Sequence, residues 1–158
     1  MSARAEVAVG YRKVMVGVDG SETAKGALME AAQIAAREGS ELLIVSSYEP
    51  PDIRQLERWQ AESPQEVSWR LTGTTLVEEV LRSASQLVRK EVALDPKTRF
   101  EEGDPAEVLI TVAQEEGVDL IVVGNKGMTG AKRFLLGSVP NKISHHSPCD
   151  LLIVKTTD

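Results

Sequence analysis

Short runs of apolar, largely β-branched residues alternate along this chain with stretches whose apolar residues recur at helical spacing. The strongest run is 118–123, shorter ones lie at 14–18, 42–45 and 151–154, and a weak, polar strand is expected at 98–100. Helical spacing follows Gly20, covers 76–88, resumes at Asp104 and returns at 138–145. Such alternation builds a parallel sheet with helices on both faces. The sequence therefore predicts an α/β fold, a Rossmann-like open sheet of five parallel strands, in one domain spanning residues 1–158.

Capping residues mark the ends of two expected helices. Ser21 precedes the first helical stretch and Gly39 follows it, as an N-cap and a C-terminal stop do. Asp104 and Pro105 open the third helix, because aspartate caps the free amides and proline fits the first helical position. Residues 98–100 are short and polar, so we expect that strand at an edge of the sheet.

Residues 49–72 are expected to form a long loop, with one short helical piece around 53–59. Both tryptophans of the chain, Trp59 and Trp69, lie in it. They would either belong to a lid over a ligand or hold the loop against the domain. Residues 1–10 are expected to be flexible.

Charge and cysteine content exclude several classes of function. The net charge of −6 argues against general affinity for nucleic acid or anionic membranes. No apolar run reaches the roughly 18 residues of a membrane span. The single cysteine, Cys149, excludes an internal disulfide, and the N-terminus lacks the pattern of a signal peptide. We therefore expect a cytoplasmic protein.

Glycine-rich turns follow the first and fourth expected strands. In open parallel sheets, ligands bind at the carboxyl ends of the strands, where the strand order reverses. The residues that this rule selects are Gly17, Val18, Asp19, Gly124, Asn125, Lys126, Gly127, Gly137 and Ser138.

The second of these turns has the features of a phosphate site. Gly124 and Gly127 allow tight backbone turns, and Gly137 with Ser138 places amides and a hydroxyl at a helix N-terminus. Residues 120–149 contain no acidic side chain. They carry four basic ones, Lys126, Lys132, Arg133 and Lys142. The simpler interpretation is that the glycines only make turns and the basic side chains are only solvated.

Asp19 has two candidate roles. Its carboxylate could accept hydrogen bonds from ribose hydroxyls, or it could share the capping of the first helix with Ser21. Two standard nucleotide motifs are absent from the sequence: the phosphate loop of P-loop enzymes and the G-x-G-x-x-G turn of dinucleotide-binding domains.

The spacing Gly124-x2-Gly127-x9-Gly137-Ser138 resembles the motif of ATP-binding members of the universal stress protein family. The opening strand with its turn, 16–21, and the closing strand, 149–154, also resemble that family. The resemblance implies the strand order 3-2-1-4-5 and a homodimer joined through 151–154. It implies an adenine nucleotide site formed by Val18, Asp19, Ser47, Val123, Gly124, Gly127, Gly137, Ser138 and Val139.

Three positions depart from the family pattern. Asn125-Lys126 replaces the more usual hydroxyl and His or Arg, and Pro140 removes one donor for phosphate. Gly17 is expected to leave extra space at the base, as in some actinobacterial members that resemble cyclic AMP binders. Three functions therefore remain: an ATP-binding regulatory module, a cyclic AMP sensor or buffer, and a weak ATPase using Mg²⁺ held by bound phosphates.

A cysteine nucleophile is the remaining enzymatic hypothesis. His145 and His146 precede Cys149 closely, which invites a Cys–His pair. The alternative is that the histidines balance the dipole at a helix C-terminus and the thiol is inert. We expect the second, and therefore predict no catalytic residues and no protein-bound metal.

Overall fold

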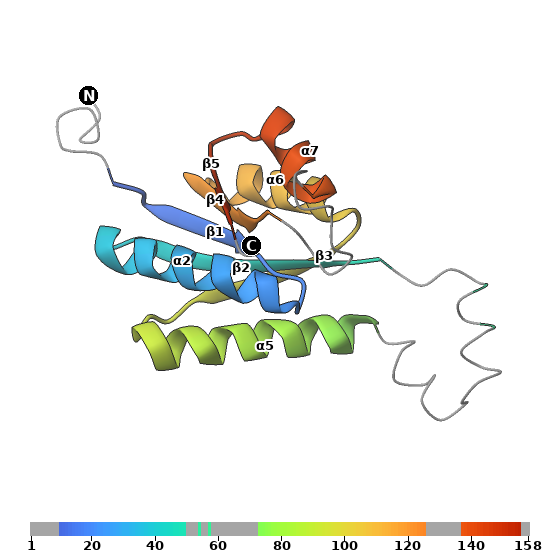
Figure 1. Ribbon diagram of the computed structural model, residues 1–158, viewed down its shortest axis with the longest axis horizontal. Helices are drawn as coiled ribbons and strands as arrows, with labels where there is room; N and C mark the ends of the chain where they lie inside the picture. Colours follow the sequence, from blue (N-terminus) through green and yellow to red (C-terminus); the bar gives the residue numbers. More distant parts are fainter. Residues whose placement is uncertain (1–9, 50–53, 55–56, 58–72, 126–136, 156–158) are drawn as a thin grey trace.

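The protein was studied as a computed structural model, which describes residues 10–49, 54, 57, 73–125 and 137–155. Five parallel strands form one sheet in the order β3-β2-β1-β4-β5 (Figure 1). Their bounds are β1 (Lys13–Gly17), β2 (Glu41–Tyr48), β3 (Lys97–Glu102), β4 (Leu120–Gly124) and β5 (Asp150–Val154). The predicted fold class and strand order are confirmed.

Among the described residues, two helices cover each face of the sheet (Figure 1). On one face lie α2 (Glu22–Glu38) and α5 (Gly73–Val92), and on the other lie α6 (Pro105–Glu116) and α7 (Ser138–His146). This arrangement follows from the alternation of short apolar runs with helical stretches, because each parallel crossover returns a helix to one face of the sheet.

The core lies in two layers because successive strand residues point to opposite faces. In β1, Val14 and Val16 pack under α2 and α5, whereas Met15 packs under α6; all three are fully buried. In β4, Ile121 and Val122 are likewise fully buried on opposite faces. A strand buried on both faces has a continuous apolar sequence, and the strand predicted at 118–123 is found at Leu120–Gly124.

The predicted helix caps are present. The Ala24 N–H donates to Ser21 Oγ at 3.2 Å, and Gly39 ends α2 in the left-handed conformation with φ 70°. The Glu107 N–H donates to Asp104 Oδ2 at 3.2 Å. These caps satisfy amides and carbonyls that have no partner within the helix itself.

The expected end of the second strand is wrong by three residues. β2 continues from Val45 to Tyr48, because β3 lies beside it and pairs with the additional residues. Ser46 is opposite Phe100, and Tyr48 is opposite Glu102. β3 itself is at the edge of the sheet, as predicted.

The N-terminal segment 1–10 and the loop 49–72 lie mostly outside the described residues. Residues 1–9, 50–53, 55–56 and 58–72 are not described, so the expected flexibility of 1–10 and the role of the tryptophans stay predictions. Arg54 and Glu57 are described and are helical, in agreement with the short helical piece expected there.

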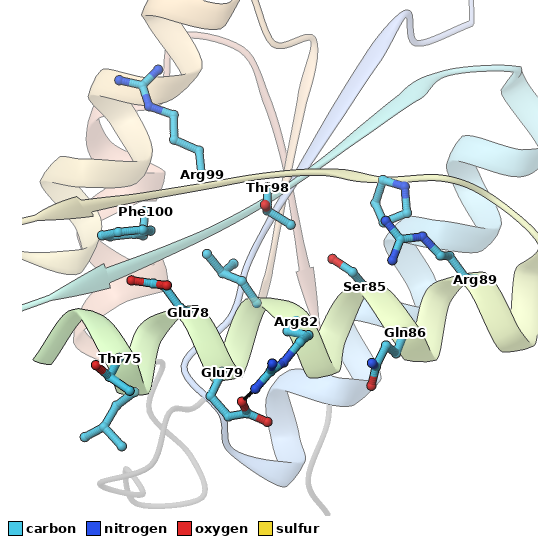
Figure 2. Close-up of a pocket in the computed structure, with 13 residues that line it drawn as sticks. Thr75, Glu78, Glu79, Arg82, Ser85, Gln86, Arg89, Thr98, Arg99 and Phe100 are labelled. Atoms are coloured by element: carbon cyan, nitrogen blue, oxygen red, sulfur yellow. Dashed lines mark ion pairs between the residues drawn. The ribbon is translucent and has the colours of Figure 1, made fainter. Parts of the chain in front are cut away.

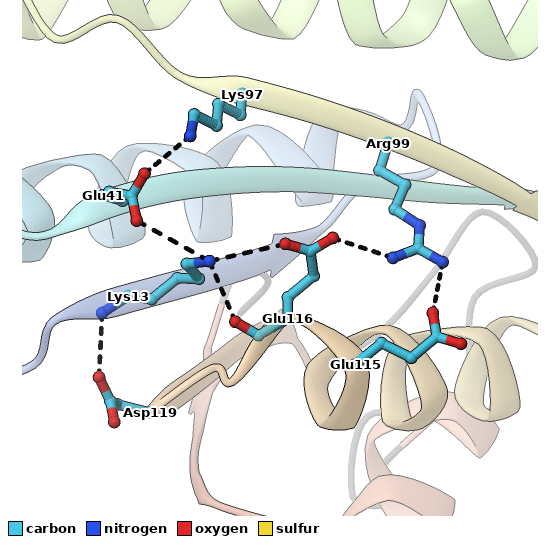
Figure 3. Close-up of polar contacts among 7 residues, drawn as sticks. All are labelled: Lys13, Glu41, Lys97, Arg99, Glu115, Glu116 and Asp119. Atoms are coloured by element: carbon cyan, nitrogen blue, oxygen red, sulfur yellow. Dashed lines mark hydrogen bonds and ion pairs between the residues drawn. The ribbon is translucent and has the colours of Figure 1, made fainter.

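A network of ion pairs joins the N-terminal ends of three strands to the end of α6 (Figure 3). Lys13 Nζ lies 3.8 Å from Glu41 and 3.5 Å from Glu116, and Lys97 Nζ lies 2.9 Å from Glu41. Arg99 pairs with Glu116 at 3.0 Å. Exposed pairs of this kind contribute little stability one by one. The network lies at the edge of the sheet where the strands begin, opposite the edge where they end.

Candidate functional site

The carboxyl ends of β1 and β4 lie side by side. Val14 is opposite Leu120 and Val16 is opposite Val122, so the two strands end at the same edge of the sheet. The chain leaves β1 toward β2 on one side and leaves β4 toward β5 on the other. This is the position at which the strand order reverses and at which open sheets bind ligands.

Backbone hydrogen bonds join the turn after β4 to the start of α7. The Gly137 N–H donates to the Asn125 carbonyl at 2.9 Å, and the Asn125 N–H donates to the Val154 carbonyl, also at 2.9 Å. Gly124 and Asn125 therefore lie beside Gly137 although residues 126–136 separate them in sequence. Lys126 and Gly127, together with the basic Lys132 and Arg133, lie outside the described residues.

The N-terminus of α7 presents backbone donors at this edge. Gly137 is the N-cap and offers no side-chain cap, while Pro140 has no N–H. The Asn141 N–H is bonded to the Gly137 carbonyl at 3.1 Å. Among the described residues no partner is seen for the N–H groups of Ser138 and Val139. The helix dipole adds partial positive charge at these two donors, so the terminus favours an anion.

Asp19 lies in the turn between β1 and α2, with an exposed side chain. Its Oδ1 accepts from the Ser21 N–H at 2.9 Å and from Ser21 Oγ at 2.5 Å. Ser21 Oγ in turn accepts from Ala24, so Asp19 supports the helix cap through Ser21. The capping alternative for Asp19 is thus present in the structure, while its role toward ribose stays a prediction.

Val18 is held in place by hydrogen bonds to β2, and its predicted contact with a base stays a prediction. Its side chain is buried, its N–H donates to the Val45 carbonyl at 2.9 Å, and its carbonyl accepts from Ser46 Oγ at 2.8 Å. The contact comes from Ser46, which was not predicted for the site, and the role of the neighbouring Ser47 beside a base stays a prediction. Because strand residues alternate, Ser46 points to the same face as Leu42 and Ile44 of β2. That alternation was the signal that could have identified it.

Gly17 does not leave the open space that was expected. A Cβ at this position would lie 2.7 Å from Leu109 Cδ1, because Leu109 of α6 packs over the glycine. Leu109 is buried, so it has little freedom to move away. The absent side chain therefore allows close packing of β1 against α6 on this side of the strand.

Lys142 does not contribute the free positive charge that the sequence suggested. Its Nζ lies 3.2 Å from Asp104 and 3.2 Å from Glu107, both of α6. The hydrogen bonds from Glu107 and Asp104 raise the pKa of Lys142 above its ordinary value. Lys142 therefore links α7 to the beginning of α6, and its charge is balanced there.

The Cys–His hypothesis receives no support from the geometry. His145 and His146 are exposed at the end of α7, and Cys149 is half-buried just before β5. Burial raises the pKa of the Cys149 thiol, which keeps it protonated at neutral pH, whereas a nucleophile needs the thiolate. In the described part of the chain, no three acidic, histidine or cysteine side chains come together to hold a metal ion. No described helix is long and apolar enough to cross a membrane.

A large groove of about 1140 Å³ lies away from this edge, between α5 and β3 (Figure 2). None of the residues predicted for the nucleotide site lines it. The two locations are therefore separate features of the molecule.

Comparison with known proteins gives a consistent result. The sequence model of a family described as the Universal stress protein family matches residues 10–155. A universal stress protein of Mycobacterium tuberculosis is 38% identical over 149 residues, covering 93% of this chain and 98% of the relative. A universal stress protein solved in complex with cAMP is 32% identical, with a TM-score of 0.72 over 94% of this chain and 99% of the other. The universal stress protein UspA from Lactobacillus plantarum shares the fold, with a TM-score of 0.76 at 24% identity over 93% of this chain and 99% of the other.

Proposed function

Because this chain belongs to the universal stress protein family, we propose that it binds an adenine nucleotide at the carboxyl ends of β1 and β4. The observation that carries the proposal is the hydrogen bond from the Gly137 N–H to the Asn125 carbonyl. It brings a helix N-terminus to the turn after β4, where the strand order also reverses. The resemblance at 32% identity to a protein solved with cAMP supports the same ligand class.

The phosphate end of the ligand belongs at the N-terminus of α7. Ser138 and Val139 supply backbone N–H groups, and Ser138 adds an exposed hydroxyl. Gly124 lets the backbone of the turn approach closely. Lys126 and Gly127 lie outside the described residues, and their role in this part of the site is carried over from the sequence motif alone.

The nucleoside end belongs beside the end of β1. Asp19 is exposed there and carries the carboxylate that ribose hydroxyls would meet. Val18 is held by Val45 and Ser46, so it offers a rigid wall for the base rather than new hydrogen bonds. Ser47 and Val123 complete the predicted surroundings from the ends of β2 and β4.

The proposed role is regulatory binding, with ATP as the ligand that the glycine motif implies and cAMP as the second candidate, because the relative solved with cAMP favours it. We also propose a homodimer through β5. Its residues Leu151 to Val154 are only half-buried at the edge of the sheet, where an apolar strand needs a partner. Sedimentation at micromolar concentration tests the dimer, and a strictly monomeric mass would contradict it.

Calorimetric titration with ATP, AMP and cAMP is the direct test of the ligand. We expect saturable binding of an adenine nucleotide at one site per chain, and at least about tenfold weaker binding of the matching guanine nucleotide. Tighter binding of cAMP than of ATP would select the sensor role, and phosphate release above the buffer rate with Mg²⁺ would identify turnover. If no adenine nucleotide binds at millimolar concentration, the proposal is wrong.

Replacing Lys142 with methionine should leave nucleotide affinity within about twofold of the wild type. The reason is that the Lys142 ammonium already pairs with Asp104 and Glu107, so its loss removes little attraction for a phosphate. Because exposed ion pairs contribute little to stability, the free energy of unfolding should be nearly unchanged. Calorimetry and urea unfolding measure the two effects. An affinity loss of about tenfold or more would mean that Lys142 turns toward the ligand.

A further inference from the structure

A groove of about 1140 Å³ runs between α5 and the edge strand β3, on the face of the sheet that α2 and α5 cover (Figure 2). This volume is that of a large ligand pocket. The apolar lining comes from both walls and from the turn between them, and consists of Leu76, Leu81, Pro96 and Phe100. Leu76 is 53% exposed, the only large apolar side chain among the described residues that is exposed to this degree. The groove therefore presents apolar surface to the body of a ligand.

One carboxylate at the groove has no partner. Glu78 lines the groove, and among the described residues it makes no ion pair or hydrogen bond. The other charged side chains that line it are paired, in the ion pairs Arg82–Glu79, Arg89–Asp95, Arg99–Glu115 and Arg99–Glu116. Arg99 also points away from the groove, toward α6 (Figures 2 and 3). The described lining thus carries one negative charge that no neighbour balances.

Glu78 faces an aromatic ring across the groove. Its carboxylate points from α5 toward β3, and Phe100 of β3 turns one face of its ring toward it (Figure 2). The face of an aromatic ring is electron-rich, so the ring and the carboxylate both attract a cation. Tyr48 packs against the same ring, with 6.2 Å between the ring centroids, and so helps to hold Phe100 in place. This end of the groove is therefore suited to a positively charged group.

Ser85 supplies a hydrogen-bonding group two helical turns farther along α5. It is only 4% exposed, and its hydroxyl points into the groove toward Thr98 of β3 (Figure 2). Among the described residues this hydroxyl has no partner, although buried polar groups usually have one. Seven residues separate Glu78 from Ser85, about 10 Å at the rise of an α-helix. This spacing places both on one face of α5, with Leu81 between them.

We propose that the groove binds a small amphipathic amine. The ammonium group of the ligand lies between Glu78 and Phe100, its apolar chain covers Leu81, and a hydroxyl at its other end bonds Ser85. Glu78 would repel an anionic ligand, and a purely apolar one would leave the Ser85 hydroxyl unpaired. The groove therefore selects against nucleotides, and this site is distinct from the one proposed at the carboxyl ends of β1 and β4.

An NMR titration of the nucleotide-free protein with 8-amino-1-octanol tests the proposal. This probe carries an ammonium group and a hydroxyl at the two ends of an octyl chain. We expect saturable binding, with shifts of backbone amides in α5 and β3. The compound 1,8-octanediol should bind about tenfold more weakly, because it makes neither an ion pair nor a cation–π contact. The compound n-octylamine, which lacks the hydroxyl, should bind about threefold more weakly.

Two substitutions locate the two ends of the probe. Glu78→Gln should weaken binding of 8-amino-1-octanol about fivefold and leave that of 1,8-octanediol within about twofold. Ser85→Ala should abolish the preference for 8-amino-1-octanol over n-octylamine. It should leave the unliganded protein at least as stable in urea, because the hydroxyl that it removes has no partner among the described residues.

Glu91→Gln is the matched control, because it makes the same change at an exposed position of α5 that does not line the groove. It should leave all three affinities unchanged. Equal affinities of the protein for the amine and the diol would overturn the proposal, as would equal effects of Glu78→Gln and Glu91→Gln. A failure to saturate at millimolar probe concentration would also overturn it.

Two further outcomes would assign the groove or the probe elsewhere and would likewise overturn the proposal. Amide shifts at Gly124 and Gly137, without shifts in α5 and β3, would place the probe at the proposed nucleotide site. An affinity that rises when the protein is diluted would mean that a second copy of the chain occupies the groove. None of these measurements involves nucleotide, so they succeed or fail independently of the proposed function.

Discussion

Replacing Ser138 with aspartate is expected to weaken binding of an adenine nucleotide about 100-fold while leaving the unliganded protein at least as stable. The new carboxylate would lie where the α7 N-terminus is proposed to hold phosphate. Two unit charges about 4 Å apart repel by roughly 4 kcal/mol near a protein surface, and exposure of Ser138 reduces this to about 2 to 3 kcal/mol. Each 1.4 kcal/mol changes affinity about tenfold.

The same substitution should raise the free energy of unfolding of the unliganded protein. An acidic side chain in the first helical turn interacts favourably with the helix dipole, by about 0.3 to 1 kcal/mol. α7 has no acidic residue in that turn and no side-chain cap at Gly137. Calorimetry and thermal unfolding of the same sample therefore separate a lost binding interaction from a damaged fold.

Ser144→Asp provides the matched control. Ser144 is exposed near the other end of α7, about 9 Å farther along the helix axis, so the added charge is largely screened at physiological salt. We expect its nucleotide affinity within about threefold of the wild type. Equal losses in the two variants would show that total charge, rather than the α7 N-terminus, governs binding, and the proposed site would then be misplaced.

The fold could be predicted because its determinants are local in sequence. β4 is apolar at every position from Leu120 to Val123, as a strand buried on both faces must be. Ser21 and Gly39 cap α2 through contacts within a few residues. The end of β2 could not be predicted in the same way, because Ser46 to Tyr48 are strand only by pairing with β3, which is far along the chain.

The candidate site was predictable to the level of the backbone. The glycine spacing located the turn after β4 and the start of α7, and a hydrogen bond joins them. Side-chain partners were not predictable, since Lys142 meets Asp104 and Glu107 more than thirty residues away in sequence. The space beside Gly17 was misjudged for the same reason, because Leu109 fills it from a different helix.

The packing of Leu109 on Gly17 leads to a prediction about stability. Leu109→Ala should lower the free energy of unfolding by about 3 kcal/mol, because it removes a buried side chain from the layer under α6. Gly17→Ala alone should cost about 1 to 2 kcal/mol, since its Cβ would lie 2.7 Å from Leu109 Cδ1 in a packed core. Both values are measured by urea unfolding at one protein concentration.

In a protein that already carries Leu109→Ala, the Gly17→Ala substitution should raise the free energy of unfolding instead of lowering it. With Leu109 shortened the clash disappears, and alanine is favoured over glycine within a strand by about 0.5 to 1 kcal/mol. Gly17→Ala should therefore stabilise the Leu109→Ala protein, which gives a coupling energy of about 2 kcal/mol. Val112→Ala, also buried in α6 but farther from the position of the new Cβ than Leu109, should show coupling below about 0.5 kcal/mol. Additive costs for Gly17 and Leu109 would mean that Leu109 does not limit the size of residue 17, and the space beside the end of β1 would then be open to a ligand after all.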